Sequence, residues 1–250
     1  MPGSASACMK PPTGPRVVRA DPIFRLETSM TEPPQFELYS FWRTSATYRV
    51  RVALALKGLT ATERTVDLEA GEQRSEAFLA INPLGAIPAL VEQGRPPLTQ
   101  SLAILEFLDE TEPSPPLLPA DPHGRARVRA IACMLAADTH PMITPRVRKY
   151  LTGSGGFDDA AWRAWQTHWF TTGLQAVEKR LSGDAETGAY CHGDVITMAD
   201  ICLASLIVVM RVFRISVPDI PTVERIMARC EANPAFAGAD PYRQEGAPAN

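Results

Sequence analysis

Residues 81–110 read Ile-Asn-Pro-Leu-Gly-Ala-Ile-Pro-Ala-Leu-Val-Glu-Gln-Gly-Arg-Pro-Pro-Leu-Thr-Gln-Ser-Leu-Ala-Ile-Leu-Glu-Phe-Leu-Asp-Glu. Pro88 precedes the apolar residues 89–91, and a proline is tolerated at the first residue of a strand because its missing N–H need not join the ladder. Residues 92–95 separate this run from residues 97–99 and predict a hairpin. Leucines recur at helical spacing at positions 102, 105 and 108, so we expect a helix that begins at Ser101.

Two features of this segment suit a bound ligand. A cis Ile87–Pro88 bond would turn the preceding backbone N–H and C=O outward, where an extended ligand can pair with them. Ser101 stands at a helix start, where free N–H groups and the positive end of the helix dipole hold a carboxylate. Taken singly, each feature also has a plain structural explanation, an edge-strand proline and an ordinary N-cap.

The elements before residue 81 extend the pattern. Residues 36–40 alternate in polarity and predict a strand, and the polar turn at residues 44–47 is rich in hydroxyls that cap helices. A helix is expected over residues 46–57, with Gly58 at its end. Residues 62–68 contain a second strand, and residues 75–80 form a short helical piece. The resulting β-α-β-α-β-β-α order predicts a thioredoxin-like α/β domain.

A different composition follows residue 112. Residues 112–119 are rich in proline and predict a joint between domains. Beyond Asp121 only helical patterns appear, interrupted near Pro141 and Pro145, so the second domain is expected to be all-α. The predicted organisation is a disordered extension over residues 1–34, a thioredoxin-like ligand-binding domain over 35–112, a linker over 113–122, a helical substrate domain over 123–240 and a tail over 241–250.

The composition narrows the classes of function. Lys and Arg number 25 against 28 Asp and Glu, a net charge of −3 without a long basic run, so no nucleic-acid partner is expected. The longest apolar runs are too short for a membrane span. The five cysteines lack paired spacing and indicate reduced thiols of a cytoplasmic protein. The four histidines lack ligand spacing, so no metal site is expected.

Four motifs occur in order along the chain and carry a resemblance: Tyr48-Arg49-Val50-Arg51-Val52-Ala53-Leu54-Ala55-Leu56-Lys57-Gly58, Asn82-Pro83, Gln100-Ser101-Leu102-Ala103-Ile104, and His192-Gly193-Asp194 with Thr197-Met198-Ala199-Asp200. Over about residues 36–240 the chain resembles the glutathione S-transferase superfamily, with the zeta class nearest. The resemblance implies glutathione as co-substrate, a homodimer and a role in detoxification. It also implies a cis Pro88 that pairs, through Ile87, with the cysteinyl backbone of glutathione.

The resemblance assigns further residues to glutathione. Gln100 and Ser101 would grip the γ-glutamyl carboxylate, and Gln73 would join them. Thr44 and Ser45 stand where the first strand turns into the first helix, and the thiol of glutathione would lie there. A helix N-terminus and a hydroxyl donor both lower the pKa of a thiol. We predict Thr44 as the donor to the sulfur and Ser45 as mainly a helix cap; the alternative is that both only cap the helix.

The sequence also departs from the zeta pattern. That class has Ser-Ser-Cys where this chain has Thr44-Ser45-Ala46. Where the family tends to carry Gln, Asn and Arg, this chain aligns Leu206, Val209 and Val212, and Ile143 replaces a nearby amide. These changes predict an apolar pocket.

Arginines near that pocket leave the alternative of an acidic substrate open. Arg49 remains, and Arg211 would take the role of the missing arginine if the alignment slipped by one residue. The main prediction is a transferase that directs the glutathione thiolate at a small apolar electrophile. The alternatives are a glutathione-dependent cis–trans isomerase of maleylacetoacetate or maleylpyruvate, and a non-enzymatic binding module of the same fold.

Overall fold

The computed structural model describes residue 3 and residues 35–248. The predicted extension over residues 1–34 therefore lies, apart from residue 3, outside the described residues. Among the described residues, none of the helices is both long and apolar enough to cross a membrane.

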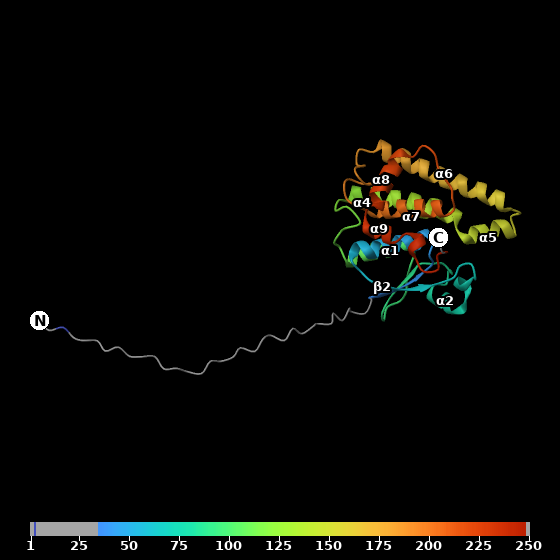
Figure 1. The fold of residues 1–250 in the computed structure, drawn as a ribbon, viewed down its shortest axis with the longest axis horizontal. Helices are drawn as coiled ribbons and strands as arrows, with labels where there is room; N and C mark the ends of the chain where they lie inside the picture. Colours follow the sequence, from blue (N-terminus) through green and yellow to red (C-terminus); the bar gives the residue numbers. More distant parts are fainter. Residues whose placement is uncertain (1–2, 4–34, 249–250) are drawn as a thin grey trace. The chain divides into compact units, whose positions relative to one another are not determined.

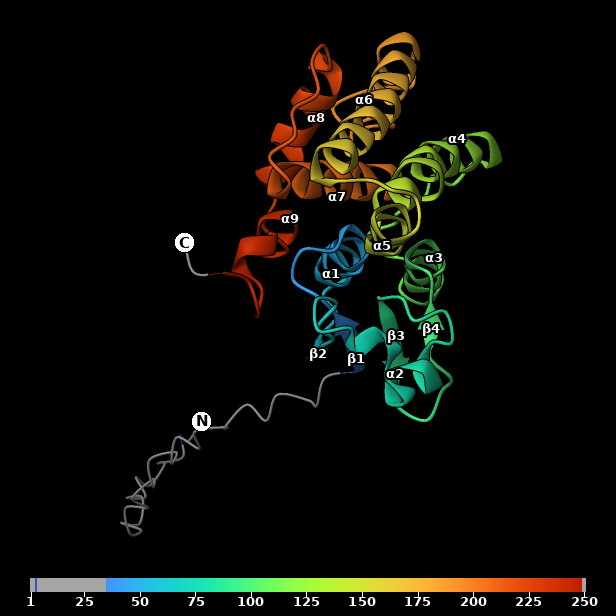
Figure 2. The same ribbon diagram turned by 90° about the vertical axis from the view of Figure 1, so that its right-hand side faces the viewer.

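A four-stranded mixed sheet forms the first half of the described chain (Figures 1 and 2). Its strands are β1 (Phe36–Ser40), β2 (Ala61–Thr65), β3 (Ala89–Glu92) and β4 (Leu98–Thr99). The strand order is β2-β1-β3-β4; β1 runs parallel to β2 and antiparallel to β3, and β3 runs antiparallel to β4. The predicted hairpin is thus the β3–β4 pair, and the predicted second strand ends at residue 65.

Helices cover both faces of the sheet. On one face α1 (Ser45–Lys57) packs beside α3 (Ser101–Thr111), and Leu38 of β1 points into this core with 1% of its surface exposed. On the other face lies α2 (Glu76–Ile81), whose Phe78 ring is 5.9 Å from the ring of Tyr39. Because neighbouring residues of a strand point to opposite faces, Leu38 and Tyr39 show that the sheet is the middle layer. This arrangement confirms the predicted thioredoxin-like α/β domain.

The rest of the described chain is helical. Its elements are α4 (Pro122–Cys133), a π-helical turn (Met134–Thr139), a 3-10 turn (His140–Ile143), α5 (Pro145–Gly153), α6 (Asp159–Gly183), α7 (Met198–Val212), α8 (Pro221–Glu231) and α9 (Pro234–Gly238). Short 3-10 turns also occur at Glu72–Arg74 and Pro241–Arg243. Pro141 and Pro145 each start a new helical piece, because a proline lacks the N–H that would continue the preceding helix.

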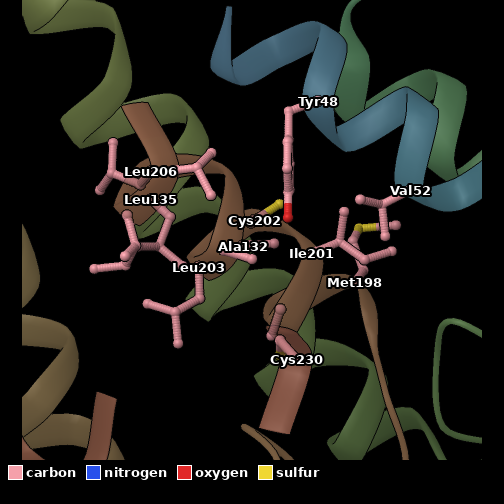
Figure 3. Close-up of a cluster of buried hydrophobic side chains, with 14 of the residues drawn as sticks. Tyr48, Val52, Ala132, Leu135, Met198, Ile201, Cys202, Leu203, Leu206 and Cys230 are labelled. Atoms are coloured by element: carbon pink, nitrogen blue, oxygen red, sulfur yellow. The ribbon is translucent and has the colours of Figure 1, made fainter. Parts of the chain in front are cut away.

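Helix α7 is the centre of the core, and every residue from 198 to 210 is buried. It packs against α1, α4 and α8, and Figure 3 shows Tyr48 and Val52 of α1 reaching toward Met198, Ile201 and Cys202 of α7. Thr197 and Asp200 form a capping box at its start. The helical half is therefore packed directly onto the α1 side of the sheet domain.

The proline-rich joint is fixed by one buried cation. The amine of Lys57, at the end of α1, lies 2.8 Å from Oδ1 of Asp109 and 2.6 Å from each of the carbonyl oxygens of Glu112 and Pro115. The Lys57 side chain is fully buried. An ion pair with two further carbonyl acceptors satisfies the three protons of the ammonium group. The joint therefore follows a defined path over the end of α1.

Candidate active site

The strand register brings the ligand-binding candidates of the first domain to one edge of the sheet. Ala89 pairs with Tyr39 on one side and with Thr99 on the other. In an antiparallel ladder, Pro88 then stands between the end of β1 and Gln100. The Ile87–Pro88 bond is cis, as the sequence predicted. Gln100 is the N-cap of α3, with φ of 69°, and Ser101 is the buried first residue of that helix.

Gln73 makes a close backbone contact with Gly85, three residues before Pro88. A Cβ at Gly85, which has φ of 62°, would lie 2.8 Å from the carbonyl oxygen of Gln73, so only glycine fits there. The side-chain Oε1 of Gln73 is buried and has no hydrogen-bond partner among the described residues. Buried polar atoms are nearly always paired, so an unpaired one indicates a missing donor. The amine and amide N–H groups of glutathione are donors of this kind, and the residues at this edge fit that molecule.

The hydroxyls of Thr44 and Ser45 have different surroundings. Thr44 is half-buried, and its Oγ1 lies 2.6 Å from Oγ1 of Thr47 and 3.3 Å from the carbonyl oxygen of Phe41. Ser45 is 1% exposed, and its Oγ donates to Oγ of Ser205 on α7 at 3.0 Å. The predicted capping role of Ser45 is wrong, because the N-cap of α1 is Thr44 and makes no side-chain cap bond. Ser45 instead ties α1 to α7, while Thr44 faces less crowded space.

A pocket of about 230 Å³ opens next to this turn. Its apolar wall includes Ile143, Val209 and Phe213, and its polar lining includes Thr44, Ser45 and Thr144. The remaining lining residues are Arg43, Leu68, Glu69, His140, Pro145 and Arg148. The pocket therefore combines hydroxyls at a helix N-terminus with an apolar wall and two cations.

The two cations of the pocket differ in how firmly they are held. Arg43 pairs with Glu69 at 2.5 Å, and its guanidinium carbon lies 5.7 Å and 5.5 Å from the ring centroids of Phe41 and Trp42. Arg148 pairs with Asp159 at 3.1 Å, and both side chains of that pair are more than half exposed. Surface ion pairs of this kind contribute little energy and exchange readily with water. Arg148 can therefore meet an anion that enters the pocket at little cost, whereas Arg43 would have to exchange its contact with Glu69 for the anion.

Arg49 lies behind the pocket. It is 1% exposed, and its Nε donates to the carbonyl oxygen of Ser45 at 3.3 Å. Nη2 of Arg49 lies 3.4 Å from Nδ1 of His140. Burial lowers the pKa of Arg49 from its ordinary value. Burial and the Arg49 charge together lower the pKa of His140 to about 3, so His140 is neutral at physiological pH.

The structure also shows where α7 places the residues aligned with the family's polar groups. Val209 lines the pocket, whereas Leu206 is fully buried and Val212 is half-buried. Arg211 is exposed and forms an ion pair with Glu231 of α8. Arg211 therefore lies outside the pocket, on the side of α7 that faces Glu231.

Sequence reasoning missed all four ionisable residues of the pocket: Arg43, Glu69, His140 and Arg148. Arg43 directly precedes the hydroxyl pair, and this adjacency was the one available signal. His140 lies in the 3-10 turn and Arg148 in α5, both of which follow the π-helical segment. No sequence pattern predicted the π-helical geometry that positions them. Within residues 35–248, no group of three or more His, Cys, Asp or Glu side chains is arranged to hold a metal ion.

Comparison with known proteins gives a consistent answer. A family model for the glutathione S-transferase N-terminal domain matches residues 34–110. A probable maleylacetoacetate isomerase of Vibrio cholerae is 42% identical over 212 residues, which cover 84% of this chain and 97% of that protein.

Solved structures agree with this match. A maleylacetoacetate isomerase from Methylobacterium extorquens AM1, crystallised with malonate and glutathione, is 48% identical with a TM-score of 0.84, over 85% of this chain and 100% of that one. A maleylpyruvate isomerase described as a bacterial zeta-class glutathione S-transferase is 38% identical with a TM-score of 0.82, over the same shares of the two chains. Relatives this similar over nearly their full length are enzymes, which removes the alternative of a non-enzymatic module. The chain therefore belongs to the glutathione S-transferase superfamily, as an enzyme closest to its zeta class.

Proposed function

We propose that this enzyme binds glutathione and uses it to isomerise a cis-configured keto acid of the maleylacetoacetate or maleylpyruvate type. The observation that carries the proposal is the pocket beside Thr44, which Arg43 and Arg148 both line. Two cations suit the two carboxylates of such a substrate, because guanidinium groups bind carboxylates through charge-assisted hydrogen bonds. The proposal differs from the transferase that the sequence favoured, and the isomerases among the relatives support the change.

Glutathione would be held at the sheet edge by Gln73, Ile87, Pro88, Gln100 and Ser101. The N-terminus of α3 offers free N–H groups to the γ-glutamyl carboxylate beside Gln100 and Ser101. The unpaired Oε1 of Gln73 offers an acceptor to a donor of the same ligand. These residues bind and orient glutathione so that its sulfur faces the N-terminus of α1.

Thr44 would stabilise the sulfur of glutathione as a thiolate, which supplies the nucleophile of the reaction. The Thr44 hydroxyl donates to the sulfur, and the positive end of α1 favours the anion. The substrate accepts the sulfur electron pair at one alkene carbon, while its π pair moves to the conjugated carbonyl oxygen. The former double bond can then rotate. Return of the electrons to the carbon–carbon bond breaks the carbon–sulfur bond and releases the trans acid.

A second candidate function is transfer of glutathione to apolar electrophiles. Its support is the pocket wall formed by Ile143, Val209 and Phe213, which has no group to pair with a carboxylate. An apolar aryl electrophile would gain from burial against this wall.

Kinetics on two substrates would decide between these functions. We would compare the catalytic efficiency of the enzyme on maleylpyruvate, which has two carboxylates, and on 1-chloro-2,4-dinitrobenzene. Arg43→Met should raise KM for maleylpyruvate about tenfold or more, since a charged hydrogen bond contributes about 1.5–3 kcal/mol, while activity on the uncharged halide stays similar. Arg64→Met is the matched control, because Arg64 is an exposed arginine paired with Glu37. If the enzyme conjugates the halide efficiently but does not isomerise the keto acid, the transferase function is favoured.

Further proposals rest on the resemblance and on composition: a homodimer, a cytoplasmic location and the domain limits stated above. The four cysteines of the described region, Cys133, Cys191, Cys202 and Cys230, are free thiols, which agrees with a reducing compartment. Analytical ultracentrifugation of the full chain would test the dimer.

A further inference from the structure

The contact between Arg49 and His140 determines which nitrogen of His140 carries the proton. A guanidinium group only donates hydrogen bonds, so Nδ1 of His140, 3.4 Å from Arg49, has to be the acceptor. In a neutral imidazole the proton is then on the other nitrogen, Nε2. The charged groups that lower the pKa of His140 are Arg49 of α1 and Arg146 of α5, and both are cations, so neither favours a second proton on the ring.

Nε2 of His140 is free to act on a ligand. Within the described part of the chain it has no hydrogen-bond partner, and it is not among the buried unpaired atoms, so it reaches open space. His140 lines the pocket together with Thr44 and Arg43. A fixed N–H donor therefore borders the same pocket as the proposed sulfur site.

Helix α6 contacts the His140 turn at two points. A Cβ at Gly173 of α6 would collide with the side chain of Thr139, so α6 and the residue before His140 are in close contact. Nε1 of Trp165, also on α6, donates to the carbonyl oxygen of Met142 at 2.7 Å. A donor carried on such a supported segment needs little reorganisation when charge develops nearby.

We propose that His140 is a further catalytic residue: Arg49 holds it as the neutral Nε2–H tautomer, and that N–H donates to the substrate carbonyl oxygen that gains negative charge when the sulfur adds. This inference rests on the proposed isomerase function. His140 transfers no proton in this role; it stabilises the oxygen while the π electrons reside there and leaves the electron count of the reaction unchanged. Arg49 acts through His140 and is a positioning residue, which replaces the direct substrate contact that the sequence suggested for it.

The tautomer can be measured without any substrate. The full-length protein with ¹⁵N-labelled histidine should show one ring that is protonated at Nε2 only and stays neutral from pH 8 to pH 5, and this signal should vanish in His140→Gln. The other histidines, His123, His168 and His192, provide internal references. A His140 ring protonated at Nδ1, or one that titrates near pH 6.5, would overturn the inference regardless of activity.

The catalytic role is tested by two variants of the same residue. Removing one donor to a developing oxyanion lowers kcat by about 10²–10³-fold, so His140→Leu should lose about that much activity on maleylacetone. His140→Gln, whose amide can place an N–H near the position of Nε2, should recover part of it. Glutathione affinity by calorimetry should be unchanged in both, and the exposed His168 serves as control through His168→Leu.

The outcomes separate this inference from the proposed function. A wild-type enzyme that isomerises maleylacetone, with His140→Leu within twofold of it, would overturn the donor role and leave the proposed function standing. A wild-type enzyme without isomerase activity would refute both the proposed function and this role of His140. The tautomer measurement would then still report whether Arg49 fixes the ring.

Discussion

Replacing Ser45 with alanine should cost stability and leave thiol activation intact. Ser205 has one hydroxyl hydrogen, and it is donated to the carbonyl oxygen of Cys202 at 2.7 Å. Ser205 must therefore accept from Ser45 in the 3.0 Å contact between them. Ser45→Ala removes a donor but leaves the Ser205 hydrogen satisfied, so the free energy of unfolding should fall by about 1 kcal/mol, the net contribution of one neutral hydrogen bond.

The reciprocal substitution should cost more. Ser205→Ala leaves the buried hydroxyl of Ser45 without its acceptor, and an unpaired buried group costs about 1–3 kcal/mol. The double variant should cost less than the sum of the two, because the unpaired hydroxyl is then gone, with a coupling energy of about 0.5–1.5 kcal/mol.

Two assays check this reasoning. Urea unfolding followed by circular dichroism gives the three stability changes, and ultraviolet absorbance of the thiolate gives the pKa of bound glutathione. The reasoning is refuted if Ser45→Ala destabilises more than Ser205→Ala. It is also refuted if Ser45→Ala raises the pKa of the bound thiol, since Ser45 would then contact the sulfur.

Four further expectations follow from the same structure. Gln100→Ala and Ser101→Ala should each weaken glutathione binding tenfold or more by calorimetry, at about 1.5–3 kcal/mol per charged hydrogen bond; unchanged affinity in both would place the carboxylate elsewhere. Thr44→Val should raise the pKa of bound glutathione and lower turnover, and an unshifted titration would exclude Thr44 as the donor. Lys57→Met should cost about 3–5 kcal/mol in urea unfolding, because its carboxylate partner stays buried; a cost below 1 kcal/mol would contradict that. Burial, with the Arg49 charge, holds the pKa of His140 at about 3, below the ordinary 6.5, so the unfolded chain binds a proton that the folded chain does not. Stability should therefore fall as pH drops from 6.5 toward 3, less steeply in His140→Gln; equal slopes would show that His140 is not responsible.

The structure of the segment that we propose to hold glutathione was largely predictable from sequence, because its parts are close together in the chain. Pro88, Gln100 and Ser101 lie within one strand–hairpin–helix segment, and the antiparallel register alone places them together. The turns of that segment also depend on local residue types, such as Gly85, which has no Cβ and so lets the carbonyl oxygen of Gln73 come close. Short-range geometry of this kind follows from residue types and spacing.

The substrate side depended on long-range packing and was not predictable in the same way. The partner of Ser45 is Ser205, 160 positions further along the chain, so its classification as a helix cap was wrong. The pocket cations come from the turn after β1 and from α5, two segments that share no sequence pattern. The amphipathic pattern of a helix also leaves open which of two nearby residues lines a pocket, and only the packing of α7 separated Val209 from Arg211.

The position of Arg43 and Arg148 explains how a relative of isomerases that act on acids can have an apolar α7 face. A carboxylate that is buried among Val209, Ile143 and Phe213 without a partner would pay a large desolvation cost. Arg43 and Arg148 border the pocket with side chains that are 31% and 53% exposed. An anion held there keeps part of its hydration while it gains the charge-assisted bonds, so the desolvation cost is smaller than for a buried pair. In the proposed isomerisation, a dicarboxylate would bind with its acid groups at these arginines and its unsaturated carbons against the apolar wall, in the pocket that Thr44 and His140 also line. The apolar residues of α7 would then exclude water from the reacting carbons, so the apolar character of that helix is compatible with the proposed isomerisation.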